Sequence, residues 1–211
     1  MEIDKTQIAA GLFNKHASGY QDKYMDVSLY RDSFDFFCEQ LPGKNARILE
    51  IACGPGNITR YLLDKRPDFD ILGTDLAPNM LSLAQLNNPG AHFQLMDCRH
   101  LEKAGGNYNG VMCGFALPYL SKNDVRKLLS DIFRSLNAGG LVYLSTMEDE
   151  YENSGFKKGS SGEEIFMHYY TAAFLNKELE TNHFKVLYQE QIESTASDGT
   201  KVIDLIIIAA K

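Results

Sequence analysis

The sequence predicts an α/β fold in which a mostly parallel sheet lies between two layers of helices. Short apolar runs alternate along the chain with amphipathic helical stretches, which is the pattern of a layered α/β protein. The runs are mostly apolar on both faces, as buried parallel strands are. The last two runs differ, because a short connection containing Asp198-Gly199 joins them. This turn signal predicts an antiparallel hairpin at the end of the chain and therefore a mixed sheet.

Five strands are expected before that hairpin. They are RILEIA, DILGTD, AHFQLMD, YNGVMCGF and LVYLSTM, over residues 47–52, 70–75, 91–97, 108–115 and 141–147. The clearest helix follows Ser121, where apolar residues recur at helical spacing over residues 125–136. Ser121 and Asp124 form the pattern of a capping box at its start. The glycines at 139–140 are expected to end it.

Length and charge limit the class of protein. The 211 residues suffice for one domain, which we expect to span residues 1–211 with an N-terminal helical cap over 1–41 and an insertion over 148–170. The net charge is −7 and no cluster of lysine and arginine is present, which argues against a nucleic-acid partner. No apolar run approaches the ~18 residues of a membrane span, and the N-terminus does not resemble a signal peptide. We therefore expect a cytoplasmic protein with no membrane partner.

The four cysteines lack the spacing of a metal site. None belongs to a C-x-x-C pair, and no histidine is spaced with them as a zinc ligand would be. We expect no metal and four free thiols in a reducing compartment. They are Cys38, Cys53, Cys98 and Cys113.

The turn in ILEIACGPGNIT carries the main functional signal. Gly54 and Gly56 allow a tight turn between a strand and a helix, where backbone N–H groups can approach a ligand. Asp75 ends the second strand, and a carboxylate there can accept both hydroxyls of a ribose. A dinucleotide site would have a third glycine where Thr59 stands. Glu50, just before the turn, would repel a pyrophosphate but attract an ammonium or sulfonium group.

This stretch resembles the first motif of the class I S-adenosylmethionine-dependent methyltransferases, L-D/E-x-G-x-G-x-G, with Ala52 in place of the first glycine. Other landmarks of the family follow in order: LGTDLAPNML, FQLMDCRHL, GFALPYLS, LNAGGLVYLS and the terminal hairpin. The resemblance covers about residues 45–211. It implies a Rossmann-like, mixed seven-stranded sheet in the order 3-2-1-4-5-7-6, with helices on both faces.

The resemblance also implies S-adenosylmethionine as the cofactor, S-adenosylhomocysteine as its product, and a small-molecule acceptor. Asp75 would bind the ribose, while the Asp97 side chain and the Cys98 backbone N–H would bind the adenine. In ASGYQDKY, Tyr20 would reach the methionine end of the cofactor, with Tyr24 as the second choice. The further cofactor residues implied are Glu50, Ala52, Gly54, Gly56, Leu76, Met80 and Phe115.

His168 and Tyr119 are the candidate catalytic residues on the acceptor side. His168, in MHYYT, could take a proton from the acceptor, because the pKa of histidine lies near neutrality. Tyr119, in LPYL, would line the same pocket, and the aromatic residues of the N-terminal cap could face the sulfonium. The acidic run EDEYE could attract an amine, whereas the lysines at 157–158 could meet a carboxylate. The acceptor, its reacting atom, the need for a base, and the choice between monomer and homodimer stay open.

Two other functions remain as alternatives. A non-catalytic or regulatory protein could bind the same cofactor on the same fold. An oxidoreductase with a nucleotide cofactor is a second alternative, against which Thr59 and Glu50 count. Asp75 could also serve only as a cap for the helix that follows it.

Overall fold

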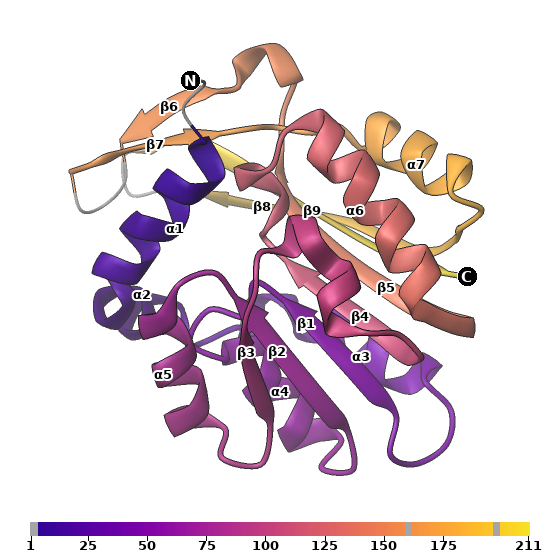
Figure 1. Ribbon diagram of the computed structural model, residues 1–211. Helices are drawn as coiled ribbons and strands as arrows, with labels where there is room; N and C mark the ends of the chain where they lie inside the picture. The colour runs from indigo at the N-terminus through magenta and orange to yellow at the C-terminus, as the bar shows by residue number, and fades with distance from the viewer. Residues whose placement is uncertain (1–3, 159–161, 196–198) are drawn as a thin grey trace.

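The computed structural model describes residues 4–158, 162–195 and 199–211, and its centre is a seven-stranded sheet (Figure 1). The strand order is β3-β2-β1-β4-β5-β9-β8, which confirms the expected mixed sheet with the last two strands exchanged. β1 to β5 are parallel, and β9 is antiparallel to both β5 and β8. Asp198 of the predicted turn lies outside the described residues. The strands are β1 Arg47–Ile51, β2 Asp70–Asp75, β3 His92–Leu95, β4 Tyr108–Gly114, β5 Leu136–Glu148, β8 Lys185–Thr195 and β9 Lys201–Ala210.

Helices cover both faces of the sheet, because each face carries its own cluster of buried apolar side chains. One cluster joins the sheet to α6 and α7 through residues such as Leu128 and Leu175. The other joins it to α3 and α4 through Phe37 and Leu62. Within the described ranges, every helix is too short or too polar to cross a bilayer. The helices are α1 Lys5–Lys15, α2 Ala17–Tyr24, η1 Ser28–Tyr30, α3 Arg31–Gln40, α4 Asn57–Lys65, α5 Pro78–Asn87, η2 Cys98–Ala104, η3 Leu117–Tyr119, α6 Lys122–Ser135, η4 Tyr151–Asn153 and α7 Ala172–Thr181.

The end of α6 differs from the expectation. The capping box of Ser121 and Asp124 is present. The helix nevertheless ends at Ser135, so the prediction that residues 139–140 end it was wrong. Leu136 already has extended backbone angles, pairs with β4 and buries its side chain in the core. Burial of this leucine against the sheet outweighs its helical spacing, and β5 begins earlier than predicted.

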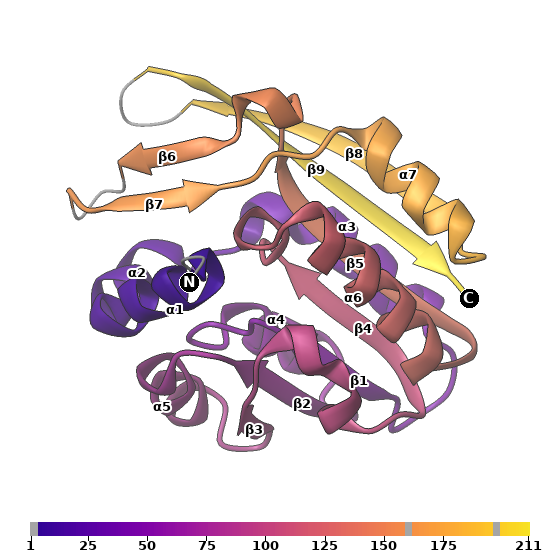
Figure 2. The same cartoon turned by 45° about the horizontal axis from the view of Figure 1, so that its top comes forward.

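The insertion over residues 148–170 contains a second, two-stranded sheet that the sequence did not predict. β6 (Gly155–Lys158) pairs antiparallel with β7 (Glu164–Met167). This hairpin lies beside α1, and the Lys5 ammonium stands 3.4 Å from the centre of the Phe166 ring. Figure 2 shows the N-terminal helices on one side of this hairpin and the β8–β9 hairpin on the other. These segments gather beyond the carboxyl ends of the parallel strands, which is where open α/β sheets bind ligands.

Candidate functional site

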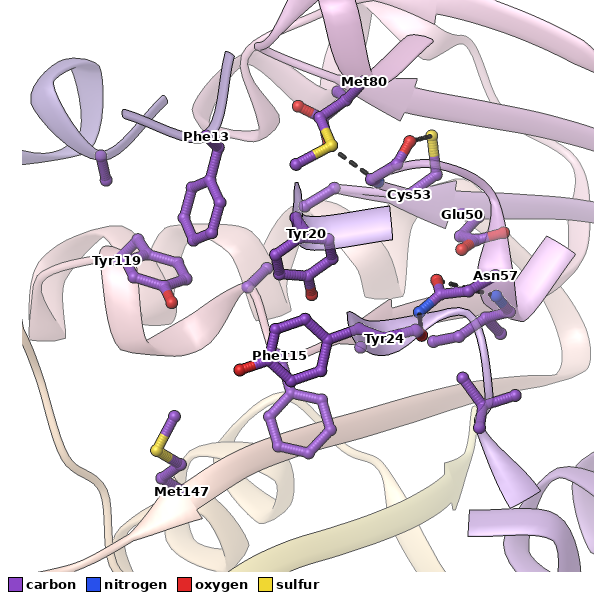
Figure 3. Close-up of a pocket in the computed structure, with 18 of the residues that line it drawn as sticks. Phe13, Tyr20, Tyr24, Glu50, Cys53, Asn57, Met80, Phe115, Tyr119 and Met147 are labelled. Atoms are coloured by element: carbon purple, nitrogen blue, oxygen red, sulfur yellow. Dashed lines mark hydrogen bonds between the residues drawn. The ribbon is translucent and has the colours of Figure 1, made fainter. Parts of the chain in front are cut away.

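A cavity of about 830 Å³ opens at the carboxyl ends of β1, β2 and β4 (Figure 3). The strand ends form its floor, and the N-terminal helices and the hairpins form its walls. All but one of the predicted cofactor residues line it, as does Tyr119. Those cofactor residues are Tyr20, Glu50, Ala52, Gly54, Asp75, Leu76, Met80, Asp97, Cys98 and Phe115.

The glycine turn is built from three residues with left-handed backbone angles. The φ angles are 53° at Ala52, 53° at Gly54 and 77° at Gly56. Gly56 does not line the cavity. It allows α4 to pack closely on α5, because a Cβ there would overlap the Asn88 amide and lie 3.3 Å from the Cα of Ala84. Gly56 therefore serves the site through packing rather than by facing the ligand.

Replacing Ala52 with glycine is expected to stabilise the protein by about 1 kcal/mol. A non-glycine residue in the left-handed region costs roughly 1–2 kcal/mol. Glycine avoids this cost, but it loses more backbone entropy on folding, which offsets part of the gain. The Ala52 side chain is exposed in the cavity, so little packing is lost. Urea unfolding checks the difference in free energy. Ala77→Gly is the matched control, because Ala77 is buried with a φ of −101°, and this change should destabilise instead. Equal destabilisation by both variants would contradict the prediction.

Asp75 holds the turn in place with both carboxylate oxygens. Oδ2 accepts the N–H of Gly54 at 2.9 Å and Oδ1 accepts the N–H of Ala77 at 2.8 Å. Burial raises the pKa of Asp75, and the backbone N–H groups act in the opposite direction. The N-cap of α5 is Ala77, and α5 has no side-chain cap hydrogen bond, so Asp75 does not cap this helix as the alternative interpretation expected. Its bond to Ala77 supports the turn that leads into α5. Each oxygen keeps a further lone pair for a ligand hydroxyl, so the two roles are compatible.

Glu50 is buried beneath the turn, with 1% of its surface exposed. Its carboxyl accepts a hydrogen bond from the hydroxyl of Thr59, which is itself fully buried. Burial raises the pKa of Glu50 to about 8. At neutral pH the free protein therefore holds Glu50 mostly as a neutral acid, whereas the sequence suggested a negative charge. Thr59, which stands in the place of the third glycine, is thus the hydrogen-bond partner of this acid.

Asp97 is bound by an arginine that sequence reasoning missed. The Nε of Arg99 lies 3.0 Å from both carboxylate oxygens of Asp97, and another nitrogen of Arg99 lies 2.9 Å from Asp4 at the start of α1. Burial raises the pKa of Asp97, but the bonds from Arg99 outweigh this and leave its pKa lowered, so Asp97 is ionised. The spacing of Asp97 and Arg99 in FQLMDCRHL was the available signal. The pair joins the cavity floor to the N-terminal helix.

Aromatic side chains from three segments meet in the cavity (Figure 3). The ring of Phe13 lies 5.0 Å from that of Tyr119 and 5.6 Å from that of Tyr20, which lies 4.6 Å from Tyr24. Burial raises the pKa of both Tyr20 and Tyr119, so these phenols stay neutral. The structure therefore brings the predicted tyrosines together as a wall that suits a cation or an apolar group.

Comparisons with known proteins agree with this geometry. A family model described as a methyltransferase domain matches residues 48–140. This match covers the turn, both strand-end acids and the fourth-strand segment, and the strand order is that of the class I enzymes. Residues 48–140 therefore match a methyltransferase domain.

The relatives of this methyltransferase domain are longer proteins. A malonyl-(acyl-carrier protein) O-methyltransferase of Enterobacter lignolyticus is 27% identical over 146 residues, which are 69% of this chain and 55% of the relative. The chain spans about half the length of the first curated relatives that it matches.

Two solved structures share the fold of the methyltransferase domain. The 1,6-didemethyltoxoflavin-N1-methyltransferase of Burkholderia thailandensis has a TM-score of 0.73 at 19% identity, covering 100% of this chain and 91% of that one. The magnesium protoporphyrin IX methyltransferase of Synechocystis PCC 6803 has a TM-score of 0.72 at 17% identity, covering 99% and 100%. Both were solved with S-adenosylhomocysteine bound. At these identities the likeness establishes the fold.

His168 does not line the cavity of the methyltransferase domain. Its backbone N–H donates to the Pro118 carbonyl at 2.8 Å. Its ring lies in an aromatic cluster, 4.8 Å from Phe166 and 5.8 Å from Tyr151. Burial, aided by the charge of Lys5, lowers the pKa of His168, and its Nδ1 has no hydrogen-bond partner among the described residues. The predicted base therefore lies outside the cavity, because its ring packs in this aromatic cluster.

A buried acid on β9 lines the cavity instead. Asp204 is 6% exposed, and its Oδ2 accepts the hydroxyl of Tyr30 at 2.7 Å. It stands within the otherwise apolar run VIDLIIIAA, and an acid in such a run was the signal that sequence reasoning passed over. Lys158 also lines the cavity, as an exposed side chain.

Proposed function

We propose that the protein is an S-adenosylmethionine-dependent methyltransferase that methylates a small-molecule acceptor by direct in-line transfer, leaving S-adenosylhomocysteine. One observation carries this proposal: a single cavity joins the glycine turn and Asp75 to the aromatic wall. Its volume of about 830 Å³ is near the upper end of the ~300–1,000 Å³ range of ligand pockets. A two-substrate reaction needs such room, because cofactor and acceptor must be bound together.

The residues present fit this cofactor. Asp75 would accept the ribose hydroxyls, Asp97 and Cys98 would meet the adenine, and Tyr20 would lie at the methionine end. S-adenosylmethionine supplies a methyl group on a positively charged sulfur. The aromatic wall would exclude water and hold the acceptor in line with that methyl group, and such alignment can supply much of the rate enhancement.

We infer the remaining properties from charge and arrangement. The net charge of −7 favours a small-molecule acceptor over a nucleic acid. The whole span 1–211 would act as one methyltransferase unit, with the cap over 1–41 closing the cofactor side and the insertion over 148–170 closing the acceptor side. The protein would work in the cytoplasm as a monomer or homodimer.

Calorimetry and turnover together test the function. S-adenosylmethionine and S-adenosylhomocysteine are expected to bind, and NAD is not. A panel of small metabolites, followed by release of S-adenosylhomocysteine, then tests catalysis. Binding of NAD without binding of the sulfonium compound would overturn the proposal. Cofactor binding with no turnover across the panel would favour the non-catalytic alternative.

Cofactor binding at neutral pH is expected to release a proton from Glu50. The free protein holds this group with a pKa of about 8, and the positive charge of the methionine end would lower the pKa in the complex. Affinity should therefore rise as pH increases toward about 8 and level off above the pKa of the free state. Calorimetry in buffers of different ionisation enthalpy measures the proton released.

A pair of acid-to-amide variants controls this measurement. Glu50→Gln should abolish the proton release. Glu102→Gln, which alters an exposed acid outside the cavity, should retain it. Undiminished release from Glu50→Gln would show that another group titrates.

A further inference from the structure

Asp204 stands on the acceptor side of the cavity. The register of the sheet places it directly opposite Met147 on β5, and both residues line the cavity. Its partner Tyr30 lies with its ring 5.3 Å from that of Phe115, which follows β4. Figure 3 shows Phe115 and Met147 on the side of the cavity away from Met80. Asp204 therefore lies on the side of the cavity that Phe115 and Met147 line, and it is not one of the predicted cofactor residues.

One oxygen of Asp204 is available to a ligand. Oδ2 accepts the Tyr30 hydroxyl, but no group in residues 4–158, 162–195 or 199–211 donates to Oδ1. Oδ1 is not among the fully enclosed unpaired atoms of the described residues, so it keeps some exposed surface, and Asp204 lines the cavity. Burial and the neighbouring carboxylate raise the pKa of Tyr30, so its hydroxyl stays protonated and keeps donating to Oδ2. The tyrosine thereby fixes the carboxylate with Oδ1 unused.

The other acids that line the cavity are already engaged. Glu50 is bound by a threonine hydroxyl beneath the turn. Asp75 accepts two backbone N–H groups, and Asp97 is paired with an arginine. Asp26 is exposed and accepts a backbone N–H in its own loop. Asp204 alone among them combines burial, a position on the acceptor side and an unpaired oxygen.

We propose that Asp204 receives the proton of the acceptor's nucleophile, and that the acceptor therefore carries an N–H or O–H group on an apolar body. This proposal rests on the function proposed above. The lone pair of the nucleophile would form the new bond to the methyl carbon while the carbon–sulfur bond breaks and its electron pair returns to sulfur. The proton of the nucleophile would pass to Oδ1, leaving a neutral carboxylic acid that loses the proton to solvent as product departs. Burial raises the pKa of Asp204, which makes it a stronger base than an exposed aspartate.

The arrangement of charge disfavours a carboxylate as the reacting group. An ionised carboxylate next to Asp204 would place two like charges in a buried site. The cationic side chains that line the cavity are Lys23 and Lys158, and both are exposed. An anionic group would therefore be bound at the opening, away from the Phe115 ring. Near Asp204, the unpaired Oδ1 favours a ligand group that donates a hydrogen bond.

Three probes of similar shape test this preference on protein saturated with S-adenosylhomocysteine. The probes are phenethylamine, phenethyl alcohol and phenylpropionate, and NMR titration measures their affinities. The amine and the alcohol are expected to bind at least tenfold more tightly than the carboxylate. Asp204→Asn should weaken the amine at least tenfold, and Asp204→Glu should recover part of the loss. Asp131→Asn is the matched control, because Asp131 is a buried acid on α6 outside this cavity, and it should change affinities less than twofold.

The outcomes separate this proposal from the one on which it rests. Failure to bind S-adenosylhomocysteine at all would overturn the proposed function and this proposal with it. Normal binding of S-adenosylhomocysteine by wild type and Asp204→Asn shows that the variant is folded. If the folded wild type then binds the carboxylate as well as the amine, or binds none of the probes, or if Asp204→Asn leaves the preference intact, the role of Asp204 is wrong and the methyltransferase assignment stands.

Discussion

Gly56→Ala is expected to destabilise the protein by about 2–5 kcal/mol and to abolish cofactor binding. The left-handed φ of 77° costs an alanine roughly 1–2 kcal/mol. The added methyl would also overlap the buried Asn88 amide, which holds the carbonyls of Gly56 and Ala84 at 2.9 and 3.2 Å. Such overpacking typically costs another 1–3 kcal/mol. Urea unfolding and calorimetry with S-adenosylhomocysteine measure the two effects.

Gly139→Ala separates backbone strain from steric overlap. Gly139 has a nearly equal φ of 74°, but a Cβ there would meet no atom within 4 Å. This control should cost only about 1–2 kcal/mol and leave cofactor affinity unchanged, since it lies at the opposite end of β5 from the cavity. Equal destabilisation by the two variants would show that α4 and α5 can move apart to accept the methyl group.

Local patterns predicted those parts of the fold in which local preference and burial agree. DILGTD has apolar residues within a short run that turn residues bound on both sides, and the strand found is Asp70–Asp75. Ser121 and Asp124 satisfy each other's backbone, so their capping box depends on no distant residue. The cofactor side of the cavity was also predictable, because consecutive strand ends must meet at one edge of a parallel sheet.

The parts that sequence analysis missed depend on partners far apart in the chain. Arg99 cannot be paired with Asp4 before α1 is placed. His168 has the chemistry of a base, but the rings around it decide where it lies. In the sequence, Asp204 is an isolated acid in an apolar strand. Its hydrogen-bond partner Tyr30 is distant in the chain and is identified only in the folded structure. The acceptor side is assembled from the cap, the insertion and the last hairpin, so no short motif encodes it.

Asp75→Ala is expected to weaken binding of S-adenosylmethionine at least tenfold, which corresponds to about 1.4 kcal/mol. A hydrogen bond to a charged group contributes roughly 1.5–3 kcal/mol, and a ribose would offer two. The variant also leaves the N–H groups of Gly54 and Ala77 without their acceptor, so the turn loses its support. Calorimetry measures the affinity, and urea unfolding measures how much of the loss accompanies a destabilised fold.

Asp70→Ala is the matched control, because Asp70 is the acid at the other end of β2. Its carboxylate is about half exposed, lies 3.6 Å from Arg47, and does not line the cavity. An exposed ion pair of this kind contributes about 0–1 kcal/mol, so this variant should retain cofactor affinity within twofold. Unchanged affinity in Asp75→Ala would contradict the ribose role and leave Asp75 only the structural role that its hydrogen bond to Ala77 shows. A loss of affinity confined to Asp75→Ala would instead mean that the Asp75 carboxylate both supports the turn and binds the ribose. Of the two acids at the ends of β2, only Asp75 lies at the cavity, where it can contact the turn and the ribose.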